Sequence, residues 1–455
     1  MLDVALLAFV AMFLAFGAKR PFLWVLAYIY IDAVAPQKIG WGLIQLLPLS
    51  LIAFIAAFAG WIFFDRKQGS RFTFRQALIG ILLVYCACTT TIADFPVNAL
   101  AKWDWVWKAL LFAMFLPLTL RTRLRLEATA LIMVLALGTI VINGGIKTAL
   151  GGGGYGTLAL LVRENAGLYE GSILSTAAIA TIPLALWLAR HGTIFRPDWR
   201  MRTFVAALIF ASLLIPIGTA ARTGLLCAGL LAVLMLRSVK RRFLFAGLGA
   251  AALAVAVPFL PQSYLARMST IDEHSEDESA STRVAVWMWT LDYVKTHPFG
   301  GGFDAYRSNS FTYRMPKITG TPPNTQVTYE FVTDKGRAYH SSYFEMLGEQ
   351  GWPGLFLWFW LQLLGVWQME RIRWRFRKSE EGTGSWQWGL ATALQQSQLI
   401  YLLGAAFVGI AYQPFMFMLV GLQCGLWSYV RRTTKSAPEA RFARAPLVQT
   451  EAAIG

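Results

Sequence analysis

Apolar runs recur along nearly the whole chain, from Leu2 to Val430, with short polar segments between them. A helix needs roughly 20 mostly apolar residues to span a bilayer, and many of these runs reach or approach that length. A soluble chain of this size would divide instead into separate cores linked by polar stretches. The pattern therefore predicts an all-α polytopic membrane protein with about 12–13 transmembrane helices. The predicted segments begin near Leu2, Pro21, Trp41, Ala77, Trp105, Leu126, Leu168, Thr203, Ala220, Phe243, Ser341, Gln387 and Gln413.

Basic residues gather in alternate connections between the apolar runs. The clusters lie at residues 66–75, 121–125, 190–202, 237–242, 371–378 and 431–444. This is the positive-inside pattern, and it predicts that these segments face the cytoplasm beside an anionic leaflet of membrane lipids. A net charge of +16 would suggest a nucleic-acid partner in a soluble protein. Because the charge follows the membrane topology, we expect no nucleic acid as a partner.

The same alternation places four connections together on the opposite, periplasmic face. They are residues 143–167, the turn around Arg222, the long loop 261–340 and the turn at 412–414. The predicted organisation is transmembrane helices over 1–260, a periplasmic loop over 261–340, C-terminal transmembrane helices over 341–432 and a disordered cytoplasmic tail over 433–455. A loop as long as 261–340 is usually functional.

Two parts of the long loop have recognisable character. Residues 281–296 are too short and too charged to span a bilayer, and they fit an amphipathic helix on the membrane surface. Residues 300–334 are polar but carry several aromatic side chains, which either stack on sugar rings or pack the loop onto the bilayer. These aromatic residues are Phe303, Tyr306, Phe311, Tyr313, Tyr329 and Phe331.

Several kinds of chemistry have no motif in this chain. There is no P-loop, no Asp-x-Asp pair for a metal-bound nucleotide sugar and no Gly-x-Ser-x-Gly elbow. The cysteines, Cys86, Cys88, Cys227 and Cys424, lie inside apolar runs with no metal-ligand spacing. We therefore expect no metal and no cofactor, and the reaction would draw its energy from an activated donor in the membrane.

His340 is the strongest candidate for chemistry, because it lies where the long loop returns to the membrane. Histidine titrates near neutral pH, and the N-terminus of a helix lowers its pKa, which favours a neutral general base. The alternative is an interfacial histidine without a role. Ser342 and Glu345 have capping-box spacing, so Glu345 is predicted to be a helix cap rather than a second base. Glu345 could also do both, by holding His340 in orientation.

Two arginines are candidates for binding a diphosphate. Arg222 stands between two apolar runs on the predicted outer side, and Arg283 opens the amphipathic segment with Trp287 one turn on. A guanidinium matches phosphate oxygens bidentately, although a lone cation at a membrane boundary also snorkels to lipid phosphate. Arg163 is a weaker candidate of the same type, and His297 and Tyr343 are possible supporting residues.

These residues in this order resemble the O-antigen ligase and O-antigen polymerase superfamily, also called the Wzy-C family. The order is an arginine in a short outer turn, then Arg-x-x-x-Trp, His-Pro-x-x-Gly and His-x(10)-Gly-x-x-Gly. Here these are Arg222; Arg283 and Trp287; His297, Pro298 and Gly301; and His340, Gly351 and Gly354. The segments Lys19-Arg20-Pro21 and Tyr412-Gln413-Pro414-Phe415 are similar to the branch encoded near exosortase systems.

The resemblance implies a GT-C-like, metal-independent and inverting glycosyltransferase of the bacterial inner membrane, with its active site facing the periplasm. The donor would be an O-antigen glycan linked to undecaprenyl diphosphate, and the acceptor would be lipid A–core oligosaccharide. His340 would be the catalytic base, and Arg222 and Arg283 would bind the diphosphate. An O-antigen polymerase and a protein O-oligosaccharyltransferase share the same donor and remain alternatives, as does a transporter of lipid-linked glycans.

Overall fold

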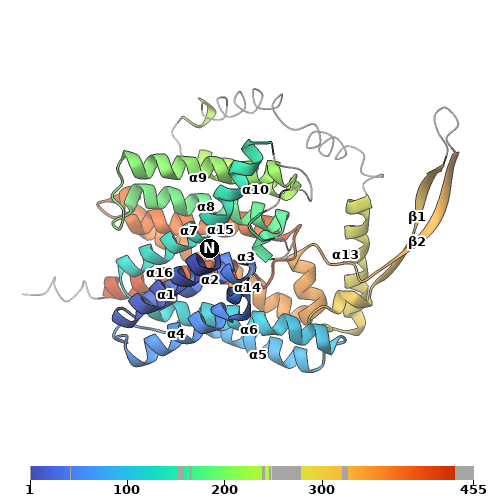
Figure 1. The fold of residues 1–455 in the computed structure, drawn as a ribbon, viewed down its shortest axis with the longest axis horizontal. Coiled ribbons are helices and arrows are strands. Elements are labelled where there is room, and N and C mark those ends of the chain that lie inside the picture. Colours follow the sequence, from blue (N-terminus) through green and yellow to red (C-terminus); the bar gives the residue numbers. More distant parts are fainter. Residues whose placement is uncertain are drawn as a thin grey trace, which may run out of the picture.

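The computed structural model describes residues 2–40, 42–151, 158, 160–162, 167–237, 241–244, 247, 278–319 and 326–435. Long helices form a bundle, and one upright helix and a two-stranded hairpin stand at one end of it (Figure 1). The helices are α1 (Leu2–Lys19), α2 (Phe22–Val34), α3 (Pro36–Ile39), α4 (Leu49–Phe63), α5 (Phe74–Thr91), α6 (Pro96–Thr119), α7 (Arg123–Ala149), α8 (Gly171–His191), α9 (Trp199–Gly218), α10 (Arg222–Leu236), α13 (Glu278–Thr296), α14 (Ser342–Arg377), α15 (Trp386–Ala405) and α16 (Pro414–Lys435). The strands are β1 (Ser310–Thr319) and β2 (Gln326–Lys335).

The fold is that of an all-α polytopic membrane protein, as the apolar runs predict. Within the described residues, five helical segments are long and apolar enough to cross a membrane. They are Phe22–Ile39, Phe74–Thr91, Arg123–Ala149, Gly171–His191 and Trp199–Gly218. Most described helices begin close to the predicted positions, but α6 begins at Pro96 rather than Trp105. The segment predicted to begin near Trp41 contains α4, which begins at Leu49 and has 15 residues, so it is shorter than the spanning helices. Most residues from 238 to 277, which include most of the segment predicted to begin near Phe243, lie outside the described part.

Close approach between helices depends on small residues. Gly421 and Gly425 of α16 lie against α6, where an added Cβ would stand 3.0 Å and 2.5 Å from side-chain carbons of Leu116 and Leu120. In the same way, a Cβ on Gly145 of α7 would meet Ala211 of α9 at 2.8 Å. Without water to drive association, helices in a membrane bind through such close van der Waals packing.

The basic connections meet at one end of the bundle. Asp65 accepts hydrogen bonds from Arg121 at 2.9 Å and from Arg125 at 2.6 Å. Burial alone would raise the pKa of Asp65, but the hydrogen bond and charge of Arg125 and the charge of Arg121 lower it. Arg432 donates to the Arg121 carbonyl at 3.1 Å. Connections that are far apart in sequence thus share one end, as the alternating charge pattern predicts.

The long loop contains the predicted helix and one element that sequence reasoning missed. The predicted amphipathic segment 281–296 is helical and forms most of α13. The strands β1 and β2 pair antiparallel, with Ser310 opposite Lys335 and Thr319 opposite Gln326, whereas only short helices were predicted here. Alternating aromatic and β-branched residues around a Gly-Thr-Pro-Pro-Asn turn are typical of a hairpin, so the signal was present. The first part of the predicted loop, residues 261–277, and the predicted disordered tail beyond residue 435 lie outside the described residues.

Candidate active site

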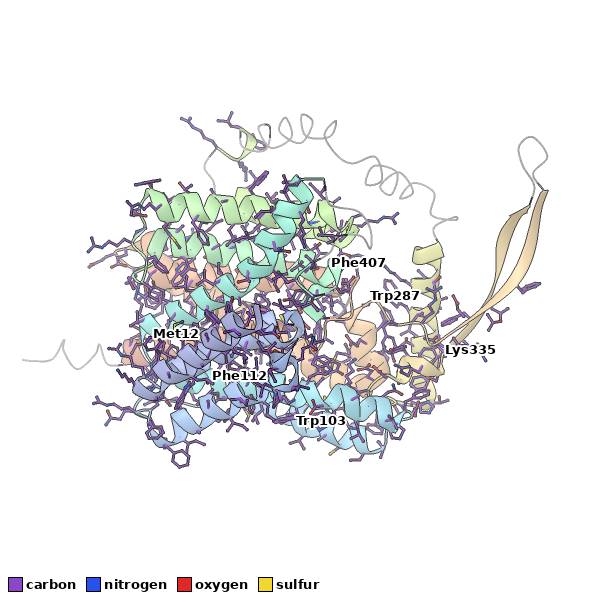
Figure 2. The ribbon with its side chains drawn as sticks, in the orientation of Figure 1. Met12, Trp103, Phe112, Trp287, Lys335 and Phe407 are labelled. Atoms are coloured by element: carbon purple, nitrogen blue, oxygen red, sulfur yellow. The ribbon has the colours of Figure 1, made fainter. Side chains whose placement is uncertain are left out.

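A cavity of about 720 Å³ opens at the end of the bundle where α13 stands. Its walls come from α6, the start of α8, α13, the segment before α14, and the α15–α16 turn. Figure 2 shows Trp287 and Phe407 at this end and Met12 at the other. Gly167, Gln413 and residues of the long loop all line it, so three connections predicted to share one face do meet. The charged and polar lining residues include Asn98, Lys102, Glu170, Arg283, Asp304, Arg307, His340, Glu345, Glu349 and Gln413.

His340 lies at the rim of this cavity in a strained backbone conformation. Its φ is +48°, in the left-handed region that L-residues avoid. This conformation costs roughly 1–2 kcal/mol for a residue with a Cβ. Ser341 follows as the N-cap of α14, so the strained turn directs the imidazole at the mouth of the cavity. Strain of this kind clusters at functional sites, where the surrounding structure maintains it.

Helix α13 holds the turn that contains His340. Trp287 donates from Nε1 to the Tyr339 carbonyl at 2.9 Å, and its ring stacks on Phe344 of α14 at a centroid distance of 5.0 Å. Arg283, one turn earlier on α13, lines the same cavity as His340. The Arg-x-x-x-Trp spacing therefore places a binding side chain and an anchoring side chain on one face of the helix.

The electrostatic surroundings keep the imidazole neutral. Desolvation at the cavity, and then the positive charges of Arg283 and Arg337, lower the pKa of His340. A histidine with a lowered pKa is unprotonated at neutral pH and can accept a proton. Arg283 therefore both lines the binding space and tunes the candidate base.

The glycines of the two family-like motifs form one joint. Gly301 donates to the Gly348 carbonyl at 3.1 Å, and Trp352 donates to the Pro298 carbonyl at 3.0 Å. Gly351 has φ +63° and interrupts α14, and a Cβ there would stand 2.2 Å from the Pro298 carbonyl oxygen. Only glycine permits both this conformation and this approach. The turn that follows α13 thus inserts into the kink of α14.

In the wall of the cavity, a mostly buried lysine binds three carboxylates. The ammonium of Lys102 lies 2.7 Å from Glu345, 2.8 Å from Glu349 and 4.0 Å from Asp304. Its ammonium also lies 5.0 Å from the centre of the Tyr412 ring. Buried charges need such partners, because removing a charge from water is expensive. Lys102 therefore ties α6 to α14 in the same cavity that His340 lines.

The predicted capping box at Ser342 and Glu345 is wrong. The N-cap is Ser341, and no side chain caps this end of α14. Ser342 donates from Oγ to the Val408 carbonyl at 2.8 Å, and Glu345 accepts from the Ala411 amide at 3.1 Å as well as from Lys102. Both side chains are turned toward the α15–α16 turn, since that turn packs on the first turn of α14. Glu345 does line the cavity, but its hydrogen bonds in the described structure do not go to His340.

The other predicted site residues have different positions. Arg222 begins α10 and is not among the described residues that line the cavity. The turn before it packs on α8, where the Thr219 and Ser175 hydroxyls are 3.0 Å apart. A role of Arg222 in the cavity stays a prediction. Tyr343 donates to the Leu402 carbonyl at 3.0 Å, and exposed His297 stacks on Tyr293, and the supporting role of both residues stays a prediction. Arg163 lies outside the described residues.

The aromatic residues of the loop divide between the two predicted roles. Tyr306 lines the cavity, whereas Phe303 is fully buried against Tyr412. Phe331 is exposed on the hairpin, and the side chains of Tyr313 and Tyr329 lie outside the described part. Burial and the charge of Asp304 raise the pKa of Tyr306, so its phenol remains a neutral hydrogen-bond donor. Trp105 and Phe407 add two further aromatic walls.

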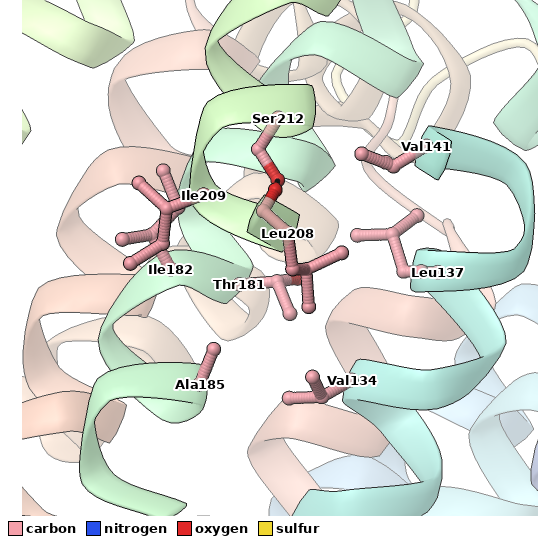
Figure 3. A pocket seen from close by; sticks show the side chains of 10 residues that line it. Val134, Leu137, Val141, Thr181, Ile182, Ala185, Leu208, Ile209 and Ser212 are labelled. Atoms are coloured by element: carbon pink, nitrogen blue, oxygen red, sulfur yellow. Dashed lines mark hydrogen bonds between the residues drawn. The ribbon is translucent and has the colours of Figure 1, made fainter. Parts of the chain in front are cut away.

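The described part of the bundle holds no cluster of metal-ligating side chains, and its small void between α7, α8 and α9 is a packing gap. Within the described ranges, no group of three or more His, Cys, Asp or Glu side chains is arranged to hold a metal ion. A small void between α7, α8 and α9 is lined almost entirely by apolar side chains (Figure 3). Its volume is about 10 Å³, at the lower limit for one water molecule, so it is a packing gap.

Sequence reasoning missed Lys102, Asp304 and Glu349. The signal for Lys102 was a charged residue next to an apolar run, because an ionisable residue at membrane depth usually has a function or a partner. Starting the helix near Trp105 instead of Pro96 left Lys102 in a connection. Glu349 lies within the motif between His340 and Gly351, but only its burial reveals that it is paired.

Comparisons with known proteins match two ranges of the chain to protein families. Residues 1–193 match a family of unknown function, DUF5935, and residues 206–359 match a family described as O-antigen ligase. No curated protein matches the chain. The matched region 206–359 contains α13, the strained turn at His340 and the joint at Gly351. The second half of this chain therefore contains a domain of the O-antigen ligase family.

Proposed function

We propose that this protein is a membrane glycosyltransferase that moves a glycan from a lipid diphosphate carrier to an acceptor hydroxyl. The observation that carries the proposal is His340, a strained histidine at the rim of a cavity that Arg283 also lines. A cavity of about 720 Å³ is within the range of natural ligand sites and has room for sugar units. The match to the O-antigen ligase family agrees with this reaction class.

In the proposed reaction, His340 removes the proton of the acceptor hydroxyl. The oxygen attacks the anomeric carbon of the donor sugar, the bond from that carbon to the diphosphate oxygen breaks, and the configuration inverts. The lowered pKa of His340 keeps it unprotonated for this step. General-base assistance of this kind contributes typically 10²–10⁴-fold to a rate.

The departing diphosphate gains negative charge, and cations aimed at that charge stabilise the transition state. Arg283 supplies one guanidinium that lines the cavity, and we assign the second to Arg222 at the start of α10. Both act through the bidentate fork that matches phosphate oxygens. This arrangement needs no metal ion, because the arginines provide the positive charge.

Lys102 allows an anionic donor to enter a cavity lined by acids. Glu345 and Glu349 are bound to Lys102, Asp304 also lies 3.4 Å from Arg307, and Glu170 caps α8 through the Ile173 amide. Each of these carboxylates is thus engaged by a cation or an amide. Tyr306, Trp105 and Phe407 offer aromatic faces against which sugar rings can pack.

The proposed donor is an O-antigen glycan on undecaprenyl diphosphate, and the proposed acceptor is lipid A–core oligosaccharide at the periplasmic face of the inner membrane. An O-antigen polymerase and a protein O-oligosaccharyltransferase would use the same donor. The deciding experiment is the lipopolysaccharide gel profile of a strain that lacks the protein. Bare core, with polymer accumulating on the lipid carrier, identifies a ligase. Core capped by a single repeat identifies a polymerase, and a normal profile with loss of glycoprotein identifies the protein transferase.

Two variants test the proposed roles in a reconstituted transfer assay. His340→Ala is expected to abolish transfer while the protein still inserts, and wild-type turnover in it would refute the base. Arg222→Lys is expected to be severely impaired, because a point charge cannot reproduce the guanidinium fork. Full activity in Arg222→Lys would mean that this side chain only reaches lipid phosphate. Movement of labelled lipid-linked glycan without a new glycosidic bond would identify a transporter instead.

A further inference from the structure

A second cavity lies at the far end of α14, away from His340. Its volume is about 290 Å³, and it opens between the C-terminal parts of α14 and α16. From Trp352, just past the kink of α14, to Arg371 the helix rises roughly 30 Å, which is about the hydrocarbon thickness of a bilayer. The two cavities therefore belong to opposite surfaces of the membrane.

Cations and tryptophans dominate the lining of this second cavity. No acidic side chain lines it in the described part of the chain. Glu370, the acidic neighbour on α14, is bonded to Arg373, which points toward Gln395 of α15. The cavity thus has a positive field that nothing in its own walls offsets. Its polar and aromatic lining residues are Arg371, Trp374, Arg375, Lys378, Trp427 and Arg431.

The tryptophans organise the cations. Arg371 lies 5.5 Å from the Trp367 ring centre, Lys378 lies 5.4 Å from Trp374, and Arg431 lies 5.9 Å from Trp427. Tryptophan prefers the headgroup level of a membrane, where one side of the ring is apolar and the other is wet. The tryptophans therefore hold these cations at the depth of the lipid headgroups.

An exposed apolar stripe on α14 leads to the cavity. Phe356, Trp360, Leu363, Trp367 and Trp374 are all exposed large side chains. Their spacing of three, four or seven residues places them along one face of the helix. A headgroup in the cavity would leave its acyl chains against this stripe.

We propose that the α14–α16 cavity binds one anionic phospholipid from the leaflet on its side of the membrane. The lipid phosphate would lie among the cations, and its acyl chains would lie along the aromatic stripe. The cations of the cavity favour an anionic headgroup over a neutral one. The aromatic stripe favours a molecule with acyl chains over a free anion. This goes beyond the general attraction of basic connections to an anionic surface, because it is a site for a single molecule between two helices.

The test uses the full-length protein, purified in neutral detergent and analysed by native mass spectrometry during titration with phosphatidylglycerol or phosphatidylcholine. The wild-type protein is expected to retain one phosphatidylglycerol at concentrations where phosphatidylcholine is lost. Arg375→Gln combined with Arg431→Gln removes one cation from each wall and is expected to weaken retention about 30-fold. Both side chains are exposed, so the fold should be maintained, and the melting temperature in neutral detergent checks this.

The matched control is Arg200→Gln combined with Arg202→Gln. These arginines are also exposed, belong to another basic cluster and include one that lies over a tryptophan, since Arg200 is 5.7 Å from the Trp199 ring. Retention in the control should equal that of the wild type. If both double variants lost phosphatidylglycerol equally, the effect would come from diffuse surface charge, and the proposal would be overturned.

Two further probes distinguish a lipid from a free anion. Inorganic phosphate and glycerol phosphate carry the charge without acyl chains, and neither should displace the bound lipid at equal concentration. Displacement by either would mean an anion site and would overturn the assignment to a lipid. Equal retention of phosphatidylcholine would also overturn it, because the cations would then select nothing.

Discussion

Replacement of His340 by glycine separates a chemical role from a structural one. The φ of +48° costs roughly 1–2 kcal/mol for an L-residue, and glycine escapes this cost. Glycine also makes the unfolded chain more flexible, which offsets roughly 0.5–1 kcal/mol. His340 keeps contact with solvent at the rim of the cavity although its imidazole is partly desolvated there, so its removal sacrifices only part of the apolar burial of a core side chain. The net expectation for His340→Gly is unchanged or slightly greater stability, by up to about 1 kcal/mol, together with loss of transfer.

The assay pairs thermal unfolding in detergent with transfer of a labelled lipid-linked glycan. His340→Ala keeps a Cβ at the strained φ, so its melting temperature should not exceed that of His340→Gly, and it should be equally inactive. Ala35→Gly is the matched control, because Ala35 also has φ +48° but lies at the junction of α2 and α3. It should gain similar stability and retain full activity. An active His340→Gly variant would refute the base, and unfolding of both His340 variants would make the residue structural.

Three further outcomes follow from the same geometry. Arg283→Gln should lower the transfer rate about 10²–10³-fold, as loss of one charge-stabilising donor does. The same variant should raise the pKa of His340, because the positive charge of Arg283 lowers it, and the acid limb of the pH–rate profile should therefore move to higher pH. An acid limb that stays in place would contradict this coupling between Arg283 and His340. Lys102→Met should destabilise the protein by about 3–5 kcal/mol because buried Glu349 loses the cation that binds it, and adding Glu349→Gln should recover much of the loss in thermal unfolding. Transfer should survive chelation by EDTA, and a sharp loss would require a metal in the reaction.

Those parts of the fold that depend on periodicity and charge placement could be predicted from sequence. The apolar runs gave the helices, and the basic connections gave the two ends of the bundle, because the bilayer constrains both directly. The hairpin formed by β1 and β2 was missed, since the aromatic residues of 310–335 were considered for stacking rather than for their alternation. Helix starts were less certain where a polar turn belongs to the helix, as at Pro96.

The candidate site was predictable only in part. His340 and Arg283 could be found because their residue types and order carry chemistry, and both line the cavity. The partners of Glu345 could not be found, because a capping-box spacing is local whereas Lys102 and Ala411 reach it from distant parts of the chain. Such tertiary contacts override the local tendency of Ser342 and Glu345 to form a capping box. The sequence of α14 alone does not reveal them.

The motif glycines have a role that spacing alone does not reveal. Gly301 and Gly351 belong to separate motifs, yet their segments meet backbone to backbone, and Glu349 of that joint binds Lys102 in the wall of the cavity. The same joint fixes the end of α13, whose Trp287 holds the turn before His340. A side chain at Gly351 would collide with the Pro298 carbonyl and displace that frame. Inactivity of a Gly351 variant would therefore report on the frame, whereas inactivity of a folded His340 variant reports on the proton transfer itself.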